Sequence, residues 1–379
     1  MTEMEKKDSK LRLMSIDVLR GFDMFFIIGG AGLIIMVCQA LGYNHDFELV
    51  KQMSHVPWEG LRHHDTIFPL FLFLAGVSWP FSLSSQISRG RSSLQIHLKI
   101  LQRAAILFAL GMAYNGVFKE FKPEFRIPSV LGFIGLSWAI GAVLFYHLKK
   151  AWVRGGLIAV LLCGYWGVLR FVAAPGAPAG CDTYAKEYNI ISWLDRTLMA
   201  DHIFRPLYDP ESLFAIVGGV AMALLGMMAG SLLKSEKFQP AQKTLILLAG
   251  FVGLLAADAL FMYVMGDKIV KSLWSPSFVL SAAAYSTFML AVFYHLVDVW
   301  GLKKWAFPFM VIGMNSITIY LMVRFIWFGG ITKYFFGGII KEIGEIDPLW
   351  APVADRTFSI LVLWLILYFF YRKKIFLKV

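Results

Sequence analysis

Charged residues are scarce in this sequence. Only 16% of the 379 residues are charged and 58% are hydrophobic, whereas a typical soluble domain has about 25% charged residues. A single water-soluble core of this length could not enclose so much apolar surface. The composition therefore excludes an ordinary soluble protein, and lipid must be the solvent for much of the chain. The aromatic content of 16% suits lipid-facing helices and membrane interfaces.

Cysteines and the motifs of common soluble enzymes are also scarce or missing. The three cysteines, Cys38, Cys163 and Cys181, have neither the spacing of a metal site nor that of a disulfide framework, so we expect no metal. There is no phosphate-binding GxxxxGK loop, no nucleophile elbow, no HExxH and no dinucleotide fingerprint. The net charge of +11 comes without any basic-aromatic module, so we expect no nucleic-acid partner.

Long hydrophobic runs are the main feature that is present. A spanning helix needs about 20 apolar residues, and ten runs meet this length. We therefore predict an all-α, polytopic transmembrane helix bundle of about ten spans, forming a single domain over 13–379 behind a polar tail over 1–12. The short, Gly-rich segment 331–343 is expected to be re-entrant or to lie on the membrane surface. The expected spans are 14–40, 66–87, 98–118, 128–147, 153–173, 213–233, 243–265, 274–297, 305–328 and 351–371.

The distribution of charge predicts the orientation of these spans. Lysines and arginines lie at both termini and after every even-numbered span among the first eight, and the loops between them hold most of the acids. By the positive-inside rule, both termini should be cytoplasmic. The terminal cations are Lys6, Lys7, Lys10 and Arg12 at the start and Arg372, Lys373, Lys374 and Lys378 at the end.

The outer loop 41–65 contains the most informative polar stretch. His55 at the outer membrane boundary could act as a general base or accept an acyl group as a nucleophile, and Asp65 could orient its imidazole. Two simpler interpretations stay open: Asp65 as the N-cap of the second span, and Trp58 as an interfacial anchor. Weaker candidates in the same stretch are His63 and His64.

Charged residues near the cytoplasmic edge could bind phosphate. Arg20 lies three residues after Asp17 on one helical face, which indicates either a local ion pair or a site for a phosphorylated cofactor. Lys99 and Arg103, one turn apart, form a cationic face that could bind phosphate; ordinary positive-inside charge is the simpler interpretation. Two acids lie deeper in spans and are functional candidates: Asp23 and Asp258.

Polar residues elsewhere could contact a substrate. Asp209 and Glu211, in the long outer loop 174–212, would suit an amino group or sugar hydroxyls; the alternative is a solvated loop in which Asp209 caps the next helix. Asn315 and Ser316 lie in the middle of a span, where they could instead join helices by hydrogen bonds.

Seven of these stretches, in order, resemble the heparan-alpha-glucosaminide N-acetyltransferase family from residue 12 to the end of the chain. One motif would be weak evidence, whereas seven in the same order and spacing indicate a shared fold. The stretches are 12–21 (RLMSIDVLRG), 55–69 (HxxWxGxxxxDxxFP), 126–128 (RIP), 208–211 (YDPE), 273–275 (LWS), 313–316 (GMNS) and 371–376 (YRKKIF).

The resemblance implies a membrane acyltransferase that passes the acetyl group of cytosolic acetyl-CoA to the amine of a glucosamine on the far side. The active histidine of the family falls on His55, which would either deprotonate the acceptor amine or carry the acetyl group. The family's cationic pair falls on Lys99 and Arg103, which favours a role at the CoA phosphates. The expected site comprises catalytic His55 and Asp65; cofactor-binding Arg20, Lys99 and Arg103; and substrate-binding Trp58, Asp209, Glu211, Trp274, Asn315 and Ser316.

Two departures from the family indicate a divergent subgroup. An asparagine that often precedes the active histidine is missing from the stretch 28–32, and a Gln-Arg pair is replaced by Gly132 and Phe133. We therefore expect an amino sugar of envelope or scavenged glycans, rather than heparan, as acceptor, and a bacterial cytoplasmic membrane as location. A homodimer is the other partnership that we consider. A sugar transporter and a non-catalytic member of the fold are the competing hypotheses.

Overall fold

The computed structural model describes residues 13–120 and 125–377. Within these ranges the chain is all-α, and its only extended pairings are two isolated bridges, Glu59 with Val270 and Ala173 with Asn189. This confirms the predicted fold class. The predicted tail over 1–12 lies outside the described residues, and so do Lys6, Lys7, Lys10, Arg12 and Lys378.

Nine helices of the described chain are long and apolar enough to cross a membrane. The protein is therefore an integral membrane protein. Three of the nine contain π-helical turns: α2 with α3 between the two helices, α12 near its end and α13 near its end. The spans are α2–α3 (Met14–Phe25 and Ala31–Ala40), α5 (His63–Ser88), α6 (Ser93–Tyr114), α8 (Val130–His147), α9 (Ala151–Phe171), α11 (Ile216–Lys234), α12 (Pro240–Ala259), α13 (Pro276–Phe293) and α17 (Ala351–Arg372).

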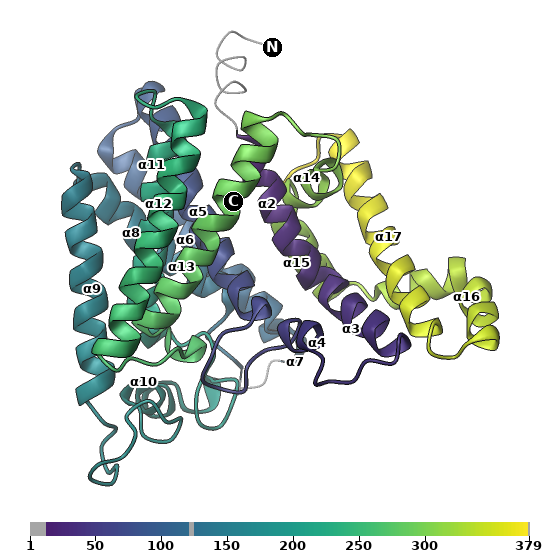
Figure 1. Cartoon of the computed structure of the whole chain (residues 1–379), viewed down its shortest axis with the longest axis horizontal. Coiled ribbons are helices and arrows are strands. Elements are labelled where there is room, and N and C mark those ends of the chain that lie inside the picture. The colour runs from purple at the N-terminus through teal and green to yellow at the C-terminus, as the bar shows by residue number, and fades with distance from the viewer. Residues whose placement is uncertain (1–12, 121–124, 378–379) are drawn as a thin grey trace.

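A tenth span is broken. Helices α14 (Phe307–Gly313) and α15 (Ser316–Phe325) occupy the predicted span 305–328 but are bent by 72° at residues 314–315. Counting this pair as one span gives the predicted ten. The segment 331–343 belongs to α16 (Phe328–Ile346), which packs against α17 at the periphery (Figure 1). The remaining short helices are α4 (Glu48–Gln52), α7 (Val117–Glu120) and α10 (Ile190–Leu194).

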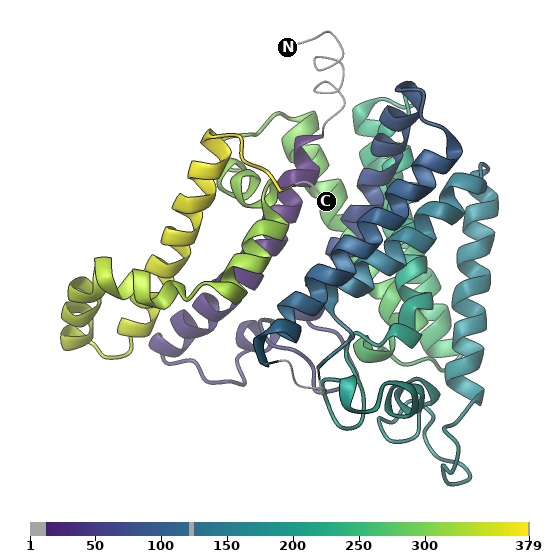
Figure 2. The same ribbon diagram turned by 180° about the vertical axis from the view of Figure 1, so that it is seen from behind.

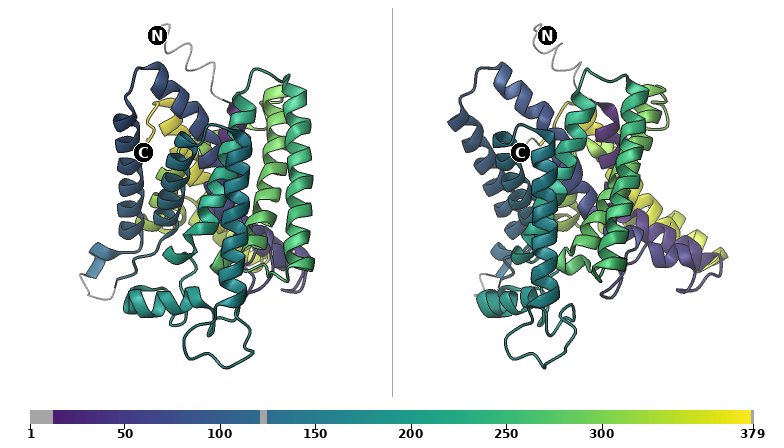
Figure 3. Two further views of the ribbon diagram at one scale, coloured as in Figure 1. Left: turned by 90° about the vertical axis from the view of Figure 1, so that its left-hand side faces the viewer. Right: turned by 60° about the vertical axis from the view of Figure 1, so that its left-hand side comes forward.

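The helices form two groups. Figures 1 and 2 show α5, α6, α8, α9, α11, α12 and α13 together in one bundle, with α2, α3 and α14 to α17 beside it. Helix α2 connects the groups because it contacts α5 and α13 as well as α14. Loop 174–212 lies at the end of the bundle opposite the start of α2 (Figure 3).

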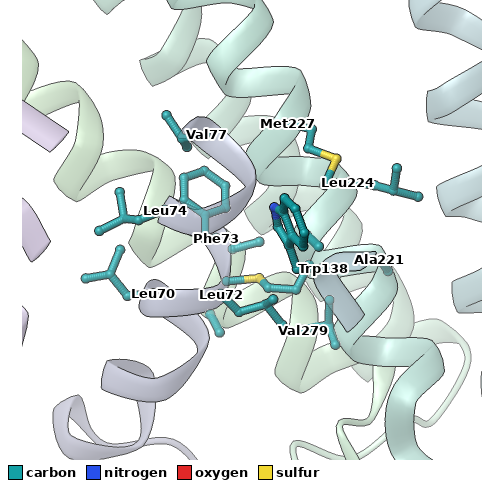
Figure 4. Packing of buried hydrophobic residues seen from close by; sticks show 14 of the residues in the cluster. Leu70, Leu72, Phe73, Leu74, Val77, Trp138, Ala221, Leu224, Met227 and Val279 are labelled. Atoms are coloured by element: carbon teal, nitrogen blue, oxygen red, sulfur yellow. The ribbon is translucent and has the colours of Figure 1, made fainter. Parts of the chain in front are cut away.

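Small residues allow the central helices to touch backbone to backbone. A Cβ on Gly226 of α11 would lie only 2.1 Å from the carbonyl oxygen of Phe73 on α5. Large side chains fill the spaces around this contact: Phe73 and Val77 of α5, Leu224 and Met227 of α11, and Trp138 of α8 are all buried (Figure 4). Lipid tails are as apolar as these side chains, so close packing, rather than exclusion of water, must hold the helices together.

The second group is anchored in the same way. A Cβ on Gly21 of α2 would lie 1.7 Å from the carbonyl oxygen of Phe309, and one on Gly313 would lie 1.8 Å from that of Asp17. Helices α2 and α14 therefore cross in contact. This crossing fixes Arg20, on α2, beside the break between α14 and α15.

Candidate active site

A cavity of about 410 Å³ runs between the two helix groups. Its walls come from α2, α5, α6, α8 and the break between α14 and α15, and they are mostly apolar. Polar residues gather at two ends, which we name the histidine end and the arginine end. The histidine end consists of His55, His64, Glu211 and Lys271, and the arginine end of Arg20, Ser78 and Arg103.

Helix α5 shows how far apart these ends are. His64 and Ser78 both line the cavity, and the stretch of helix between them rises about 21 Å at about 1.5 Å per residue. That distance is most of the hydrocarbon thickness of a bilayer, which is about 30 Å. The cavity therefore follows the membrane-spanning direction of α5 for much of its length.

His55 and Asp65 form a hydrogen-bonded pair at the histidine end. His55 Nδ1 lies 2.7 Å from Asp65 Oδ1. The Asp65 side chain is only 1% exposed and that of His55 is 56% exposed. An ionised carboxylate can only accept, so the imidazole proton belongs on Nδ1 and the lone pair on Nε2. This arrangement suits a general base or a nucleophile.

The backbone holds the Asp65 carboxylate in place. Its Oδ2 accepts hydrogen bonds from the amides of Val56, at 3.2 Å, and Arg62, at 3.3 Å. Arg62 is the N-cap of α5 and Asp65 is in the first turn, so the interpretation of Asp65 as the N-cap is wrong. As the third residue of the helix, Asp65 accepts from the amide of the N-cap residue Arg62 and also orients His55.

A lysine that the sequence did not single out completes this end. Lys271 Nζ lies 3.2 Å from Asp65 Oδ1 and 3.2 Å from His55 Nδ1. His64 also lies close to His55, and the centroids of their rings are 4.5 Å apart. Only one signal could have indicated Lys271: it is a cation on the side of the membrane where acids predominate, two residues before the LWS motif.

An ion-pair network lies behind Glu211. Arg126 donates from Nε to Asp209 Oδ2 at 2.8 Å and from Nη2 to Asp209 Oδ1 at 2.5 Å, and Nη2 also pairs with Glu211. Burial alone would lower the pKa of Arg126, but these acids hold it above its ordinary value. Asp209 is thus occupied by Arg126 and does not line the cavity, whereas Glu211 does.

Asp209 does not cap the next helix either. Ser212 has that role, because its Oγ accepts from the amide of Phe214 at 3.1 Å. Like Lys271, Arg126 was not predicted as a site residue from the sequence, although it lies in the RIP stretch. Its contact with Asp209 joins positions 83 residues apart, which spacing could not reveal.

The arginine end brings two guanidinium groups to the same wall. Arg20 pairs with Asp17 at 3.3 Å and donates to Ser78 Oγ at 3.3 Å. Arg103 stacks 4.3 Å over the ring of Trp138, and no acceptor in the described chain reaches its buried Nε. Lys99 is exposed and does not line the cavity, unlike Arg103 one turn later. This end therefore suits an anionic ligand.

The other expected substrate residues divide into two kinds. Ser316 lines the cavity, and Asn315 is 2% exposed beside it at the helix break. Neither side-chain atom of the Asn315 amide has a hydrogen-bond partner in the described part of the chain. Trp58 and Trp274 do not line the cavity. Trp58 donates to the carbonyl of Tyr184 at 3.0 Å, and Trp274 is wholly buried.

The two deep acids lie away from the cavity walls. Asp23 is buried on α2 and Asp258 on α12, where its Oδ2 accepts from Ser281 Oγ at 2.5 Å. His63 also lies outside the cavity, with its Nδ1 3.1 Å from the hydroxyl of Tyr285. None of these three residues belongs to the histidine end or the arginine end of the cavity.

Taken together, the fold and the site define a polytopic membrane protein with an intramembrane cavity that joins a histidine–aspartate pair to a pair of arginines. No protein-family model matches the chain. Human heparan-alpha-glucosaminide N-acetyltransferase is 27% identical over 421 aligned residues, which cover 97% of this chain and 60% of the human protein. The mouse protein of the same name is 27% identical over 375 residues, covering 83% of this chain and 54% of its own length.

These matches confirm the resemblance seen in the motifs. The chain is a divergent relative of the heparan-alpha-glucosaminide N-acetyltransferases and spans little more than half the length of the two relatives.

Proposed function

We propose that this protein is a transmembrane N-acetyltransferase that moves an acetyl group from cytosolic acetyl-CoA to the amine of an amino sugar on the other side of the membrane. The observation that carries the proposal is the cavity that joins His55 to Arg20 and Arg103. A donor molecule lying in it could have its phosphates at the arginine end and its thioester at the histidine end. The names of the two relatives supply the reaction type.

The arginine end is suited to the donor. CoA carries several phosphate charges, and guanidinium groups bind phosphate through charge-assisted hydrogen bonds. Arg20 and Arg103 are the residues that would hold them, and the apolar walls between the ends would contact the pantetheine arm. Lys99, which is exposed, would contribute only long-range attraction at the cavity mouth.

The histidine end is suited to the transfer. The acceptor amine attacks the thioester carbonyl carbon, so that a C–N bond forms while the C–S bond breaks. His55 Nε2 takes one proton from the amine and passes it to the departing thiolate of CoA. In the second route, Nε2 itself displaces the thiolate; the amine then attacks the acetyl carbon, a C–N bond forms while the bond from that carbon to Nε2 breaks, and the amine proton neutralises the released thiolate. Asp65 supports both routes by keeping the proton on Nδ1.

The acceptor would approach from the exposed side of His55. Glu211 is the acid at this end that could receive an amino or hydroxyl group, with Asn315 and Ser316 farther along the wall. An amino sugar of envelope or scavenged glycans fits these groups. The arginine end must face the cytosol, where acetyl-CoA is available, so the proposal includes cytoplasmic termini. It also includes a bacterial inner membrane as the location.

Transfer of label tests this function directly. Purified protein in nanodiscs is incubated with acetyl-labelled acetyl-CoA and glucosamine, and wild type is compared with His55→Ala. Labelled N-acetylglucosamine should form with wild type, and His55→Ala should reduce the rate by about 10²- to 10⁴-fold. His45→Ala is the matched control, because His45 is exposed on the same loop outside the cavity. Equal rates for the two variants would contradict the role of His55.

A sugar transporter is the second candidate, and the break between α14 and α15 is the observation that favours it. Interrupted helices line the substrate sites of many transporters. Uptake of labelled glucosamine into proteoliposomes without acetyl-CoA, together with no acetyl transfer, would support the transporter and overturn the enzyme.

A further inference from the structure

Lys271 is the cation that lines the histidine end of the cavity, and contacts with several other residues fix its place there. Its side chain is 17% exposed and lines the cavity. It lies on the segment 265–275, between the end of α12 and the start of α13. The contact with Asp65 joins residues 206 positions apart.

The segment that carries Lys271 is fixed at several points. Asp267 receives hydrogen bonds from the hydroxyl of Tyr184 and, at 2.7 Å, from the amide of Ser277. Burial and the contact with Asp267 raise the pKa of Tyr184, so the hydroxyl keeps its proton and remains a donor. The amide of Gly60, in the loop of His55, donates to the carbonyl of Ile269 at 2.8 Å. This last bond ties the lysine segment to the histidine loop.

Trp274 sets the backbone direction after Lys271. It has a φ of +47°, in the left-handed region that residues other than glycine rarely occupy. Its ring is fully buried and stacks on Phe133 with centroids 4.6 Å apart. A strained backbone of this kind persists only where the surroundings over-determine it. Packing of Trp274 therefore holds the turn that aims Lys271 at Asp65.

We propose that Lys271 is a positioning residue that holds the Asp65 carboxylate where it orients His55, with the His55 proton on Nδ1 and the Nε2 lone pair toward the cavity. An ammonium group has three donors and no acceptor, so it cannot take the Nδ1 proton. It donates instead to Asp65 Oδ1, the same oxygen that accepts the hydrogen bond from His55 Nδ1. The carboxylate keeps its place, and the ammonium group offsets part of its charge. The inference rests on the proposed function only in making His55 the reacting residue.

Lys268 provides a matched comparison on the same segment. Its Nζ lies 2.9 Å from Asp182 and 3.4 Å from Glu59, and it does not line the cavity. Burial would raise the pKa of Asp182, but the hydrogen bond from Lys268 lowers it below its ordinary value. Two lysines three residues apart therefore both pair with acids, and of these acids only Asp65, the partner of Lys271, contacts His55.

The test measures the reactivity of His55 itself, without acetyl transfer. Diethyl pyrocarbonate acylates neutral imidazole, and peptide mass spectrometry gives the rate at each histidine. Wild type is compared at pH 7 with Lys271→Met, Lys271→Gln, Lys271→Arg and Lys268→Met, all in nanodiscs. His45 is the internal reference in each sample. Lys271→Met and Lys271→Gln both remove the charge, so the test remains possible if one of them does not fold. The kcat and the KM for acetyl-CoA are measured in parallel.

We expect the charge-free variants at Lys271 to label His55 about three- to tenfold more slowly, because the uncompensated carboxylate favours the protonated imidazole. Labelling of His45 should not change, and Lys271→Arg and Lys268→Met should behave like wild type. The kcat should fall with little change in KM. Unchanged or faster labelling of His55 in both charge-free variants would overturn the proposal. If wild type transfers no acetyl group, the proposed function fails, while the labelling rates still decide the role of Lys271.

Discussion

The two ends of the cavity differ in how their charges are arranged. At the histidine end, Asp65 lies between His55 and Lys271, with both nitrogen contacts at 3.2 Å or less. At the arginine end, Arg20 and Arg103 both face the cavity, and Asp17 is the acid that pairs with Arg20. Paired opposite charges hold a proton in place, whereas neighbouring like charges bind an anion. The proposed function assigns proton transfer to the first arrangement and ligand binding to the second.

The largest effect should come from changing the acid of the histidine end. Asp65→Asn places an amide beside His55, and its N–H can donate to Nδ1 and move the imidazole proton to Nε2. We expect kcat for acetyl transfer to fall by about 10²-fold or more, with KM for acetyl-CoA nearly unchanged because the arginine end is intact. Steady-state kinetics in nanodiscs measure both values. A fall in affinity equal to the fall in rate would mean that the two ends are not separate.

An intermediate effect should come from the arginine end. Arg103→Met removes a guanidinium from the cavity wall, so KM for acetyl-CoA should rise by about tenfold or more while kcat changes little. Lys99→Met is the matched control, because Lys99 is exposed one turn away; its effect should stay below about twofold at physiological salt. Arg103→Lys tests whether charge alone is sufficient. Equal effects of Arg103→Met and Lys99→Met would restore the interpretation of both residues as ordinary positive-inside charge.

The smallest effect concerns stability, and it comes from a buried acid near the histidine end. Burial raises the pKa of Asp195 to about 7, although Ser212 donates to it at 2.7 Å. A raised pKa means that the folded protein prefers the protonated acid. The stabilisation is therefore complete below the ordinary pKa of about 4 and is lost as the pH rises to about 7.

Thermal unfolding in detergent at pH 5 and pH 7.5 measures this effect. The melting temperature of wild type should fall by a few degrees over this interval, and Asp195→Asn should flatten the dependence, since an amide mimics the neutral acid. Its oxygen can accept from the amide of Asp209, and its NH₂ can donate to Ser212. The same slope in both proteins would show that other groups cause the pH dependence.

Much of the fold could be predicted from the sequence. Spans depend on local runs of apolar residues, and nine of the ten predicted runs contain a single long helix, straight or with a π-helical turn. The exception is 305–328, where the GMNS stretch breaks the helix. Its glycine signals a close approach to α2, not a bend, so composition alone did not indicate the 72° angle. The orientation of the termini stays a prediction.

The site could be predicted only in part. His55 and Asp65 lie ten residues apart in one polar stretch, and the resemblance to a family marks both. Arg103 and Lys99 look equivalent in sequence, yet only Arg103 lines the cavity. They differ because Lys99 lies one turn nearer the start of α6 and is exposed there, whereas Arg103 packs over the ring of Trp138 on α8.

The sequence by itself determined that this chain resides in lipid, since no water-soluble core of this length could enclose so much apolar surface. It also indicated the histidine that faces the cavity. Only the tertiary structure decided which charges meet. Lys271 reaches Asp65, and Arg126 occupies Asp209, because distant loops converge at one end of the bundle. Such contacts depend on how helices pack, and no local pattern of residues records them.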